Sequence, residues 1–141
     1  MTWHYQGILV ETLPEDCVGY VYCIVNTISG RKYIGKKLAQ FAKTSIKTVT
    51  LKNGTKKKKK IRSKVESDWA SYFGSSLELN ADILALGKEH FTREILFYCQ
   101  SKAECSYREA EAQFKYEVLR FPALWYNGII SVKIHRNHIK F

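Results

Sequence analysis

The stretch that decides the fold is VGYVYCIVNTISGRKYIGKK, residues Val18–Lys37. Its YVYCIV portion is aromatic, apolar or β-branched, which is the composition of a half-buried strand. The following NTISG predicts a turn, because its glycine takes a positive φ at no steric cost. RKYIG then returns as a second strand. This pairing places the phenols of Tyr22 and Tyr33 where they could share one face beside lysines, a reactive arrangement as well as a packed one.

Composition limits the class of protein. A chain of 141 residues, 45% hydrophobic and with only two prolines, fits one domain with a moderate core. The net charge of +10 and the pI near 9.5 suit a polyanionic partner, with nucleic acid favoured over an anionic membrane. No stretch is long and apolar enough to span a bilayer, and the N-terminus lacks the pattern of a signal peptide. We therefore expect a cytoplasmic protein whose four cysteines are free thiols.

The segment from Lys36 to Lys64 is strongly basic. It contains the run Lys56–Lys60, and no acidic residue occurs between Asp16 and Glu66. Asn53-Gly54 is a turn signal between flanks that carry Thr, Val and Ile, so a long β-hairpin or a partly disordered loop would fit. A solvated charge run that aids solubility is the alternative, but such surfaces usually mix both signs. We favour contact with the DNA backbone.

The residues of this expected DNA contact are Lys37, Lys56, Lys57, Lys58, Lys59, Lys60, Arg62 and Lys64. Because the side chains of Lys56–Lys60 cannot bury apolar surface, we expect this run to be disordered without DNA.

The rest of the chain predicts both strands and helices. Residues 2–17 fit an edge strand or an extended arm, and residues 91–99 fit a further strand. Capping residues and apolar spacing predict a helical turn over Trp69–Phe73, a helix over 77–86 and a longer one over about 102–120. Residues 129–141 return as an extended tail.

The hairpin carries Tyr20-Val21-Tyr22 and, eleven residues on from tyrosine to tyrosine, Tyr33-Ile34-Gly35. This pattern closely resembles the GIY-YIG nuclease family, with Tyr20 in place of the first glycine. The resemblance covers roughly residues 18–130. It implies an α/β (α+β) fold with a small central, mainly antiparallel three-stranded sheet flanked by helices. We expect one such domain over 1–141, with the basic hairpin or loop inserted at about 38–65.

The resemblance also implies an activity, the hydrolysis of DNA phosphodiesters with one divalent metal, Mg²⁺ or Mn²⁺. Family members place a metal-binding glutamate on the helix after the third strand, ahead of a Tyr-Asn pair, which implies Glu111 ahead of Tyr126-Asn127. We expect Glu111 to share the inward face of that helix with Phe114 and Val118, and Glu109 to point elsewhere. A surface glutamate is the alternative for Glu111.

The other site residues follow from the same resemblance. Tyr22 and Tyr33 are the motif tyrosines, one of them a general base and the other a donor to substrate. A phenol with a pKa of about 10 needs nearby positive charge for the first role, and Lys36 and Lys37 are the closest source. Asn127 would orient a phosphate, a water or the carboxylate. Core packing for the tyrosines and turn formation for Asn127 are the alternatives.

One family feature has no clear counterpart. Relatives carry an arginine a short distance after YIG, and Asp68 stands where it might fall, so the charge role passes to Arg62, Lys64, Lys36 or Lys37. The layout looks most like the free-standing homing-type nucleases of tailed bacteriophages, which would act in the host cytoplasm on double-stranded DNA as a monomer or transient dimer. The rivals are a non-catalytic nucleic-acid-binding module on the same fold and a structure-specific repair or restriction-type nuclease.

Overall fold

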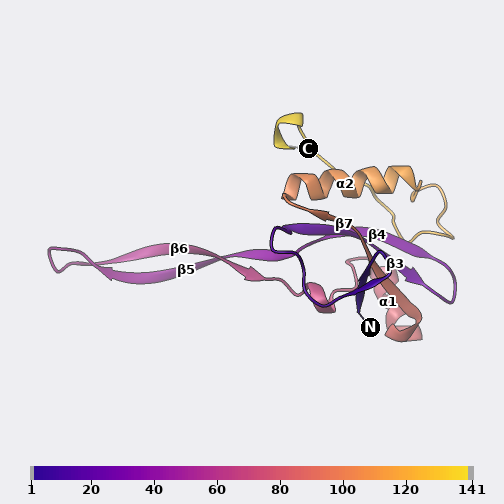
Figure 1. The fold of residues 1–141 in the computed structure, drawn as a ribbon, viewed down its shortest axis with the longest axis horizontal. Coiled ribbons are helices and arrows are strands. Elements are labelled where there is room, and N and C mark those ends of the chain that lie inside the picture. Colours follow the sequence, from indigo (N-terminus) through magenta and orange to yellow (C-terminus); the bar gives the residue numbers. More distant parts are fainter. Residues whose placement is uncertain (1, 140–141) are drawn as a thin grey trace.

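The structure is a computed structural model that describes residues 2–139, with the side chains of Ala42 and Lys43 outside this description. It consists of a folded body and a long hairpin that projects from it (Figure 1). Within residues 2–139, no helix is long and apolar enough to cross a membrane.

The body is built on a five-stranded mixed sheet with the order β2-β1-β7-β3-β4. The strands are β1 (Trp3–Tyr5), β2 (Ile8–Val10), β3 (Gly19–Asn26), β4 (Lys32–Leu38) and β7 (Phe91–Cys99). The prediction of a three-stranded sheet is therefore wrong in the number of strands. The segment before the motif hairpin forms two short strands, and β1 adds to β7 in parallel.

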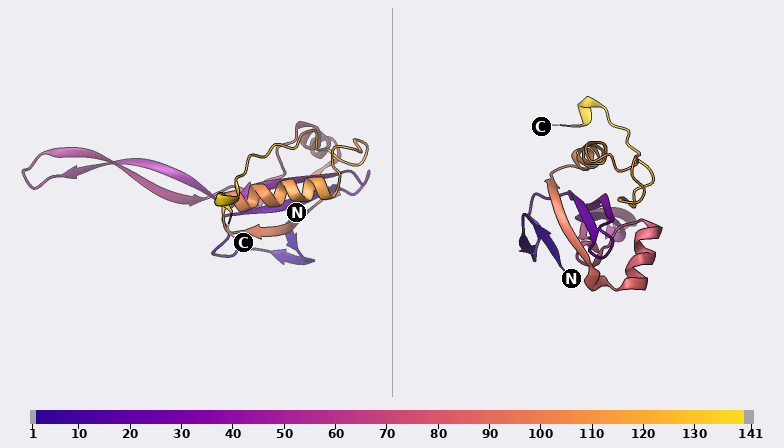
Figure 2. Two further views of the ribbon diagram at one scale, coloured as in Figure 1. Left: turned by 90° about the horizontal axis from the view of Figure 1, so that it is seen from above. Right: turned by 90° about the vertical axis from the view of Figure 1, so that its right-hand side faces the viewer.

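Two helices cover opposite faces of this sheet, as Figure 1 and the right view of Figure 2 show. α1 (Leu77–Leu86) has the expected bounds, and Ser76 caps it by accepting from the Leu79 amide. α2 (Lys102–Lys115) begins at the expected capping box but ends five residues early. The chain leaves the helix at Glu117, whose φ is +54°. Trp69–Ser71 form only a 3₁₀ turn.

Each face of the sheet has its own core. On the α1 side, aromatic residues dominate, with Trp3, Tyr20, Tyr22 and Phe91 all at most 1% exposed. On the α2 side, the buried residues are smaller: Val21, Ile34, Cys99, Cys105, Ala112 and Val118. Small side chains let α2 lie close to β3 and β4, which brings its polar residues near the motif hairpin.

The projecting hairpin, which we call the arm, comprises β5 (Gln40–Thr50), β6 (Lys56–Glu66) and the turn between them. Eleven residue pairs form an unbroken antiparallel register from Gln40–Glu66 to Thr50–Lys56. Every residue of β6 is exposed. The long basic hairpin is thus the observed alternative, formed around Asn53-Gly54.

The run Lys56–Lys60 pairs with residues 46–50, contrary to the expected disorder. Backbone pairing supplies hydrogen bonds that do not depend on buried apolar surface. The base of the arm is fixed to the body, since Ser67 donates from its amide to Ala39 and from its hydroxyl to Leu38, at 2.9 and 2.6 Å.

Candidate active site

The two motif tyrosines pack against each other on the α1 side of the sheet. Tyr22 lies on β3 and Tyr33 on β4, and their ring centroids are 6.2 Å apart. Gly35 is paired with Tyr22 across the hairpin. A Cβ atom at Gly35 would lie 2.5 Å from the Tyr22 hydroxyl oxygen and 2.9 Å from a ring carbon of Tyr33. The packing of both tyrosines therefore requires this glycine.

Tyr20, which replaces the first glycine of the motif, is a core residue. Its ring is fully buried and packs edge-on against Trp3, with centroids 5.2 Å apart. Tyr20 also packs against Tyr22 in the core, and it does not line the open pocket at β4.

An open pocket of about 320 Å³ lies at the β4 edge of the sheet. Side chains from β4, the start of α1, the middle of α2 and the segment after Tyr126 meet there. We call it the active-site pocket; its lining is Tyr33, Ser75, Ser76, Glu109, Gln113, Tyr126, Asn127, Gly128, Ile129 and Ser131. The Tyr33 hydroxyl is 3.3 Å from the Ser75 hydroxyl.

The carboxylate in this pocket belongs to Glu109, so the expected orientations of Glu109 and Glu111 are reversed. Glu109 is half-buried and shares a face of α2 with Cys105 and Gln113, at i−4 and i+4. Gln113 and Glu109 both line the pocket.

Glu111 lies on the outer face of α2. Its side chain is 47% exposed, and a carboxylate oxygen lies 3.7 Å from a guanidinium nitrogen of Arg108. Phe114 is 65% exposed. Val118 is buried, but it follows Glu117, where the chain has already left the helix, so its burial does not turn Glu111 inward. The true inward face is harder to recognise in the sequence, because it is made of small and polar residues.

Two opposing effects act on Glu109. Burial, the larger effect, raises the pKa of its carboxyl above the usual value, while the ammonium and the backbone amide of Lys36 lower it. The ammonium of Lys36 also donates to the Ser106 hydroxyl at 2.6 Å. Lys36 is therefore a neighbour of the carboxylate rather than of the phenols.

The phenols are not activated as expected. Burial raises the pKa of Tyr22 well above its ordinary value and also raises the pKa of Tyr33. Lys36 is directed towards α2, and Lys37 forms an ion pair with Asp68 at 2.6 Å. The expectation that these lysines lower a tyrosine pKa is wrong, and both hydroxyls stay protonated at neutral pH.

The side chain of Asn127 forms two hydrogen bonds with the backbone of β4, the edge strand of the sheet. Its side-chain oxygen accepts from the Ile34 amide at 3.0 Å, and its nitrogen donates to the Ile34 carbonyl at 2.8 Å. The preceding residues continue the same pattern, since Lys32 exchanges backbone hydrogen bonds with Leu124 and Tyr126. Asn127 thus fixes the far wall of the pocket to the YIG strand.

The family arginine still has no single substitute. Arg62 and Lys64 lie on β6 within the arm, paired with Thr44 and Ala42. Lys37 lies nearer to the tyrosines, with its ammonium 4.1 Å from the centroid of the Tyr72 ring.

Sequence reasoning missed Tyr72 and Arg93. The Tyr72 ring packs edge-on against Tyr22, with centroids 6.0 Å apart. Arg93 is buried on β7 and donates to the carbonyls of Ala70 and Tyr72 at 3.0 and 2.9 Å. It thereby holds the segment beside the motif tyrosines. An arginine in an otherwise apolar strand position was the available signal.

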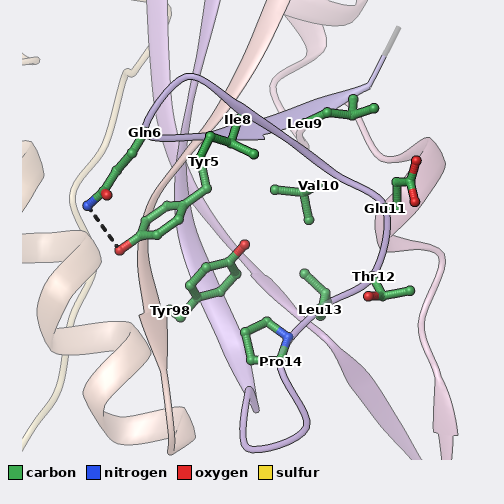
Figure 3. Close-up of a pocket in the computed structure, with 10 residues that line it drawn as sticks. All are labelled: Tyr5, Gln6, Ile8, Leu9, Val10, Glu11, Thr12, Leu13, Pro14 and Tyr98. Atoms are coloured by element: carbon green, nitrogen blue, oxygen red, sulfur yellow. Dashed lines mark hydrogen bonds between the residues drawn. The ribbon is translucent and has the colours of Figure 1, made fainter.

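A second hollow, of about 570 Å³, lies at the β2 edge, at the opposite end of the strand order from β4 (Figure 3). Its walls are mostly apolar, and the Tyr5 and Tyr98 rings stand 4.7 Å apart within it. None of the residues expected for catalysis lines it.

No cluster of three or more His, Cys, Asp and Glu side chains suited to a metal ion occurs within the described residues 2–139. The donor set of the active-site pocket is instead one carboxylate, that of Glu109, with hydroxyl and amide groups around it. This set fits Mg²⁺, which commonly takes one or two protein carboxylates and keeps several waters.

Residues 3–130 match the family model described as "Putative endonuclease segE, GIY-YIG domain". The chain belongs to the GIY-YIG endonuclease family. Searches of curated proteins and of solved structures found no match. The GIY-YIG match begins at β1, so the two N-terminal strands are part of the matched domain, and membership implies a nucleic-acid substrate.

Proposed function

We propose that this GIY-YIG protein is a divalent-metal-dependent endonuclease of double-stranded DNA, with the scissile phosphate in the active-site pocket. The observation that carries the proposal is that Tyr33 and Glu109 line the same open pocket. Tyr33 comes from β4 and packs on the α1 side of the sheet, whereas Glu109 comes from α2, which covers the other side. The arm leaves the body directly after β4. Tyr33 is the second residue of β4, and the arm begins at Gln40, up to about 23 Å further along the chain. A duplex that extends from the pocket along β4 would therefore reach the basic arm.

Glu109 would hold the metal, Mg²⁺ or Mn²⁺. When bound, such an ion neutralises charge that develops on the phosphoryl and leaving oxygens. The half-buried position of Glu109 suits this role, because a partly desolvated carboxylate gains more from a cation than an exposed one. Glu111, on the outer face of α2, is not proposed as a ligand.

The tyrosines would act as neutral groups. With its pKa raised by burial, the Tyr33 hydroxyl donates a hydrogen bond to a phosphate oxygen or holds the attacking water by accepting from it. Tyr22 is almost fully buried and supports Tyr33 by packing. Lys36 stabilises the ionised form of Glu109.

We extend the proposal to a free-standing homing-type role, on the basis of the sequence resemblance to nucleases of tailed bacteriophages. A homing nuclease cuts few sites in a long DNA. Mapping of cut ends across a phage genome tests this part, since cuts at many unrelated positions would contradict it.

The activity is tested by incubating supercoiled plasmid with the protein in Mg²⁺, in Mn²⁺ and in EDTA. We expect nicked and linear products with either metal and none in EDTA. Glu109→Gln should abolish cutting while binding to a labelled duplex persists, and Glu111→Gln is the matched control that should cut normally. Binding without cutting in every metal, on plain and on forked DNA, would contradict the proposal and favour a non-catalytic binding module.

A further inference from the structure

The arm carries nearly all of the net charge of the protein. Residues 40–66 contain ten Lys and Arg and one Glu, whereas the whole chain has 23 Lys and Arg and 13 Asp and Glu. The arm therefore holds a net +9 of the total +10. The remainder of the chain, which includes the active-site pocket, is almost neutral and attracts a polyanion only weakly.

The positive charge extends along both faces of the arm. The register places Lys56, Lys58, Lys60, Arg62 and Lys64 on one face, and Lys47, Lys57 and Lys59 on the other. Lys47 stands directly opposite Lys59. Like charges in that position destabilise a free hairpin. A phosphate bound between them would reduce this repulsion. A ribbon with cations on both faces suits a groove with phosphates along both walls.

The arm also has a defined length and direction. Eleven residues at about 3.3 Å each give strands of about 36 Å. One turn of B-form DNA is about 34–36 Å, or about 10 base pairs. Figures 1 and 2 show the arm extending from one end of the body as a twisted two-stranded ribbon. The ion pair of Lys37 with Asp68 and the hydrogen bonds of Ser67 anchor its base.

We infer that the arm lies in the major groove as a two-stranded ribbon and contacts about one helical turn of duplex, all of it on one side of the scissile phosphate. This inference rests on the proposed function for the position of the phosphate. The arm then sets the length of flanking duplex that the enzyme needs, while the pocket selects the bond. The A-form RNA duplex, whose major groove is too narrow for side chains, should be a poor ligand.

The test separates the length of the arm from its charge with two variants. Deleting residues 47–50 together with 56–59 removes four complete pairs and keeps both faces in register, because the number is even. It shortens the arm by about 13 Å, or about four base pairs. The control keeps the full length and replaces the same five lysines, as Lys47→Thr, Lys56→Thr, Lys57→Thr, Lys58→Thr and Lys59→Thr. Threonine retains strand propensity.

Both variants and the wild type are titrated in EDTA with blunt DNA duplexes of 6 to 24 base pairs and with a 24-base-pair RNA duplex. The site size is taken from the dependence of affinity on duplex length. We expect the salt slope to fall by about 4.5 in both variants, since each loses five cations. The site size should fall by about four base pairs in the deletion variant alone.

Equal site sizes for the wild type and the deletion variant would overturn the inference, as would RNA binding as tight as DNA binding. Because these measurements contain no metal, they are independent of whether the protein cuts. With Mg²⁺, cuts on an end-labelled strand should stop at least about ten base pairs before one end and continue closer to the other. Equal exclusion at both ends would contradict one-sided contact.

Discussion

The body and the arm of this protein are stabilised in different ways and are suited to different tasks. The body buries aromatic residues on one face of its sheet and small residues on the other, and its net charge is close to zero. The arm exposes every residue of β6 and carries a net +9. Under the proposed function, attraction to DNA and bond cleavage reside in separate parts of one small chain, linked through β4.

The largest expected effect separates the two glutamates of α2. Glu109→Gln should lower the rate of DNA cleavage about 10³-fold, as expected when several kcal/mol of charge stabilisation are lost. Glu111→Gln should leave the rate within about twofold, because its carboxylate faces solvent beside Arg108. Single-turnover cleavage measures both. Loss of activity in the Glu111 variant alone would restore the original expectation from the sequence.

The second prediction changes only the arm. Lys56→Thr, Lys58→Thr and Lys60→Thr together remove three cations from one face, and Lys57→Thr with Lys59→Thr removes two from the other. If both faces meet phosphates, the salt slope of binding should fall by about 2.7 and about 1.8, respectively. KM should rise while kcat at saturating DNA stays constant. A drop confined to one variant would indicate that the arm lies flat on a single backbone.

The third prediction concerns the packing of the body. Gly35→Ala should lower the free energy of unfolding by about 1–3 kcal/mol, because its Cβ would overlap Tyr22 and Tyr33. Gly128→Ala is the control, since no atom lies within 4 Å of its added Cβ. Urea unfolding measures both. Equal stability of the two variants would show that the tyrosines can move apart at little cost.

The smallest expected effect is a change in how the stability of the fold depends on pH. Because burial raises the pKa of Glu109 in the folded state, the folded protein binds a proton more tightly there than the unfolded chain does. The contribution of Glu109 to the free energy of unfolding is therefore largest below its ordinary pKa in the unfolded chain. It is lost as pH rises through the raised pKa of the folded state. Glu109→Gln should unfold at the same or a slightly higher temperature than wild type at pH 7. The melting temperatures of the variant and the wild type are compared at pH 4 and pH 7. A variant that loses stability relative to the wild type between pH 4 and pH 7 would contradict the prediction.

Much of the fold was predictable from local signals. The motif hairpin, α1, β7 and the capping box of α2 follow from turn residues, caps and apolar spacing within short segments. The parallel pairing of β1 with β7 was not predictable, because only three residue pairs form it and the paired residues are about 90 positions apart in the sequence. The early end of α2 depends on one residue with a positive φ, Glu117.

The site was predictable in outline only. Tyr33 lies on β4, Tyr22 packs against it from β3, and Asn127 bonds to β4. The choice between Glu109 and Glu111 depended on which face of α2 packs inward. Apolar spacing selected the face with Phe114, whereas the packed face carries Cys105, Ala112 and Gln113. Contacts made by polar and small residues leave little periodic signal. The position of Arg93 in an apolar strand was visible in the sequence, but its partners are the backbone carbonyls of Ala70 and Tyr72, which no residue pattern identifies.

The lysines of the arm have a further consequence, for the solubility of the protein. β5 and β6 form a two-stranded sheet, so each has one long open edge able to pair with another molecule. Repulsion between arms of like charge keeps these edges apart. At 1 M salt the screening length falls to about 3 Å, and the edges are then no longer protected. The protein should self-associate through its arms at high ionic strength, the condition normally used to keep basic proteins in solution.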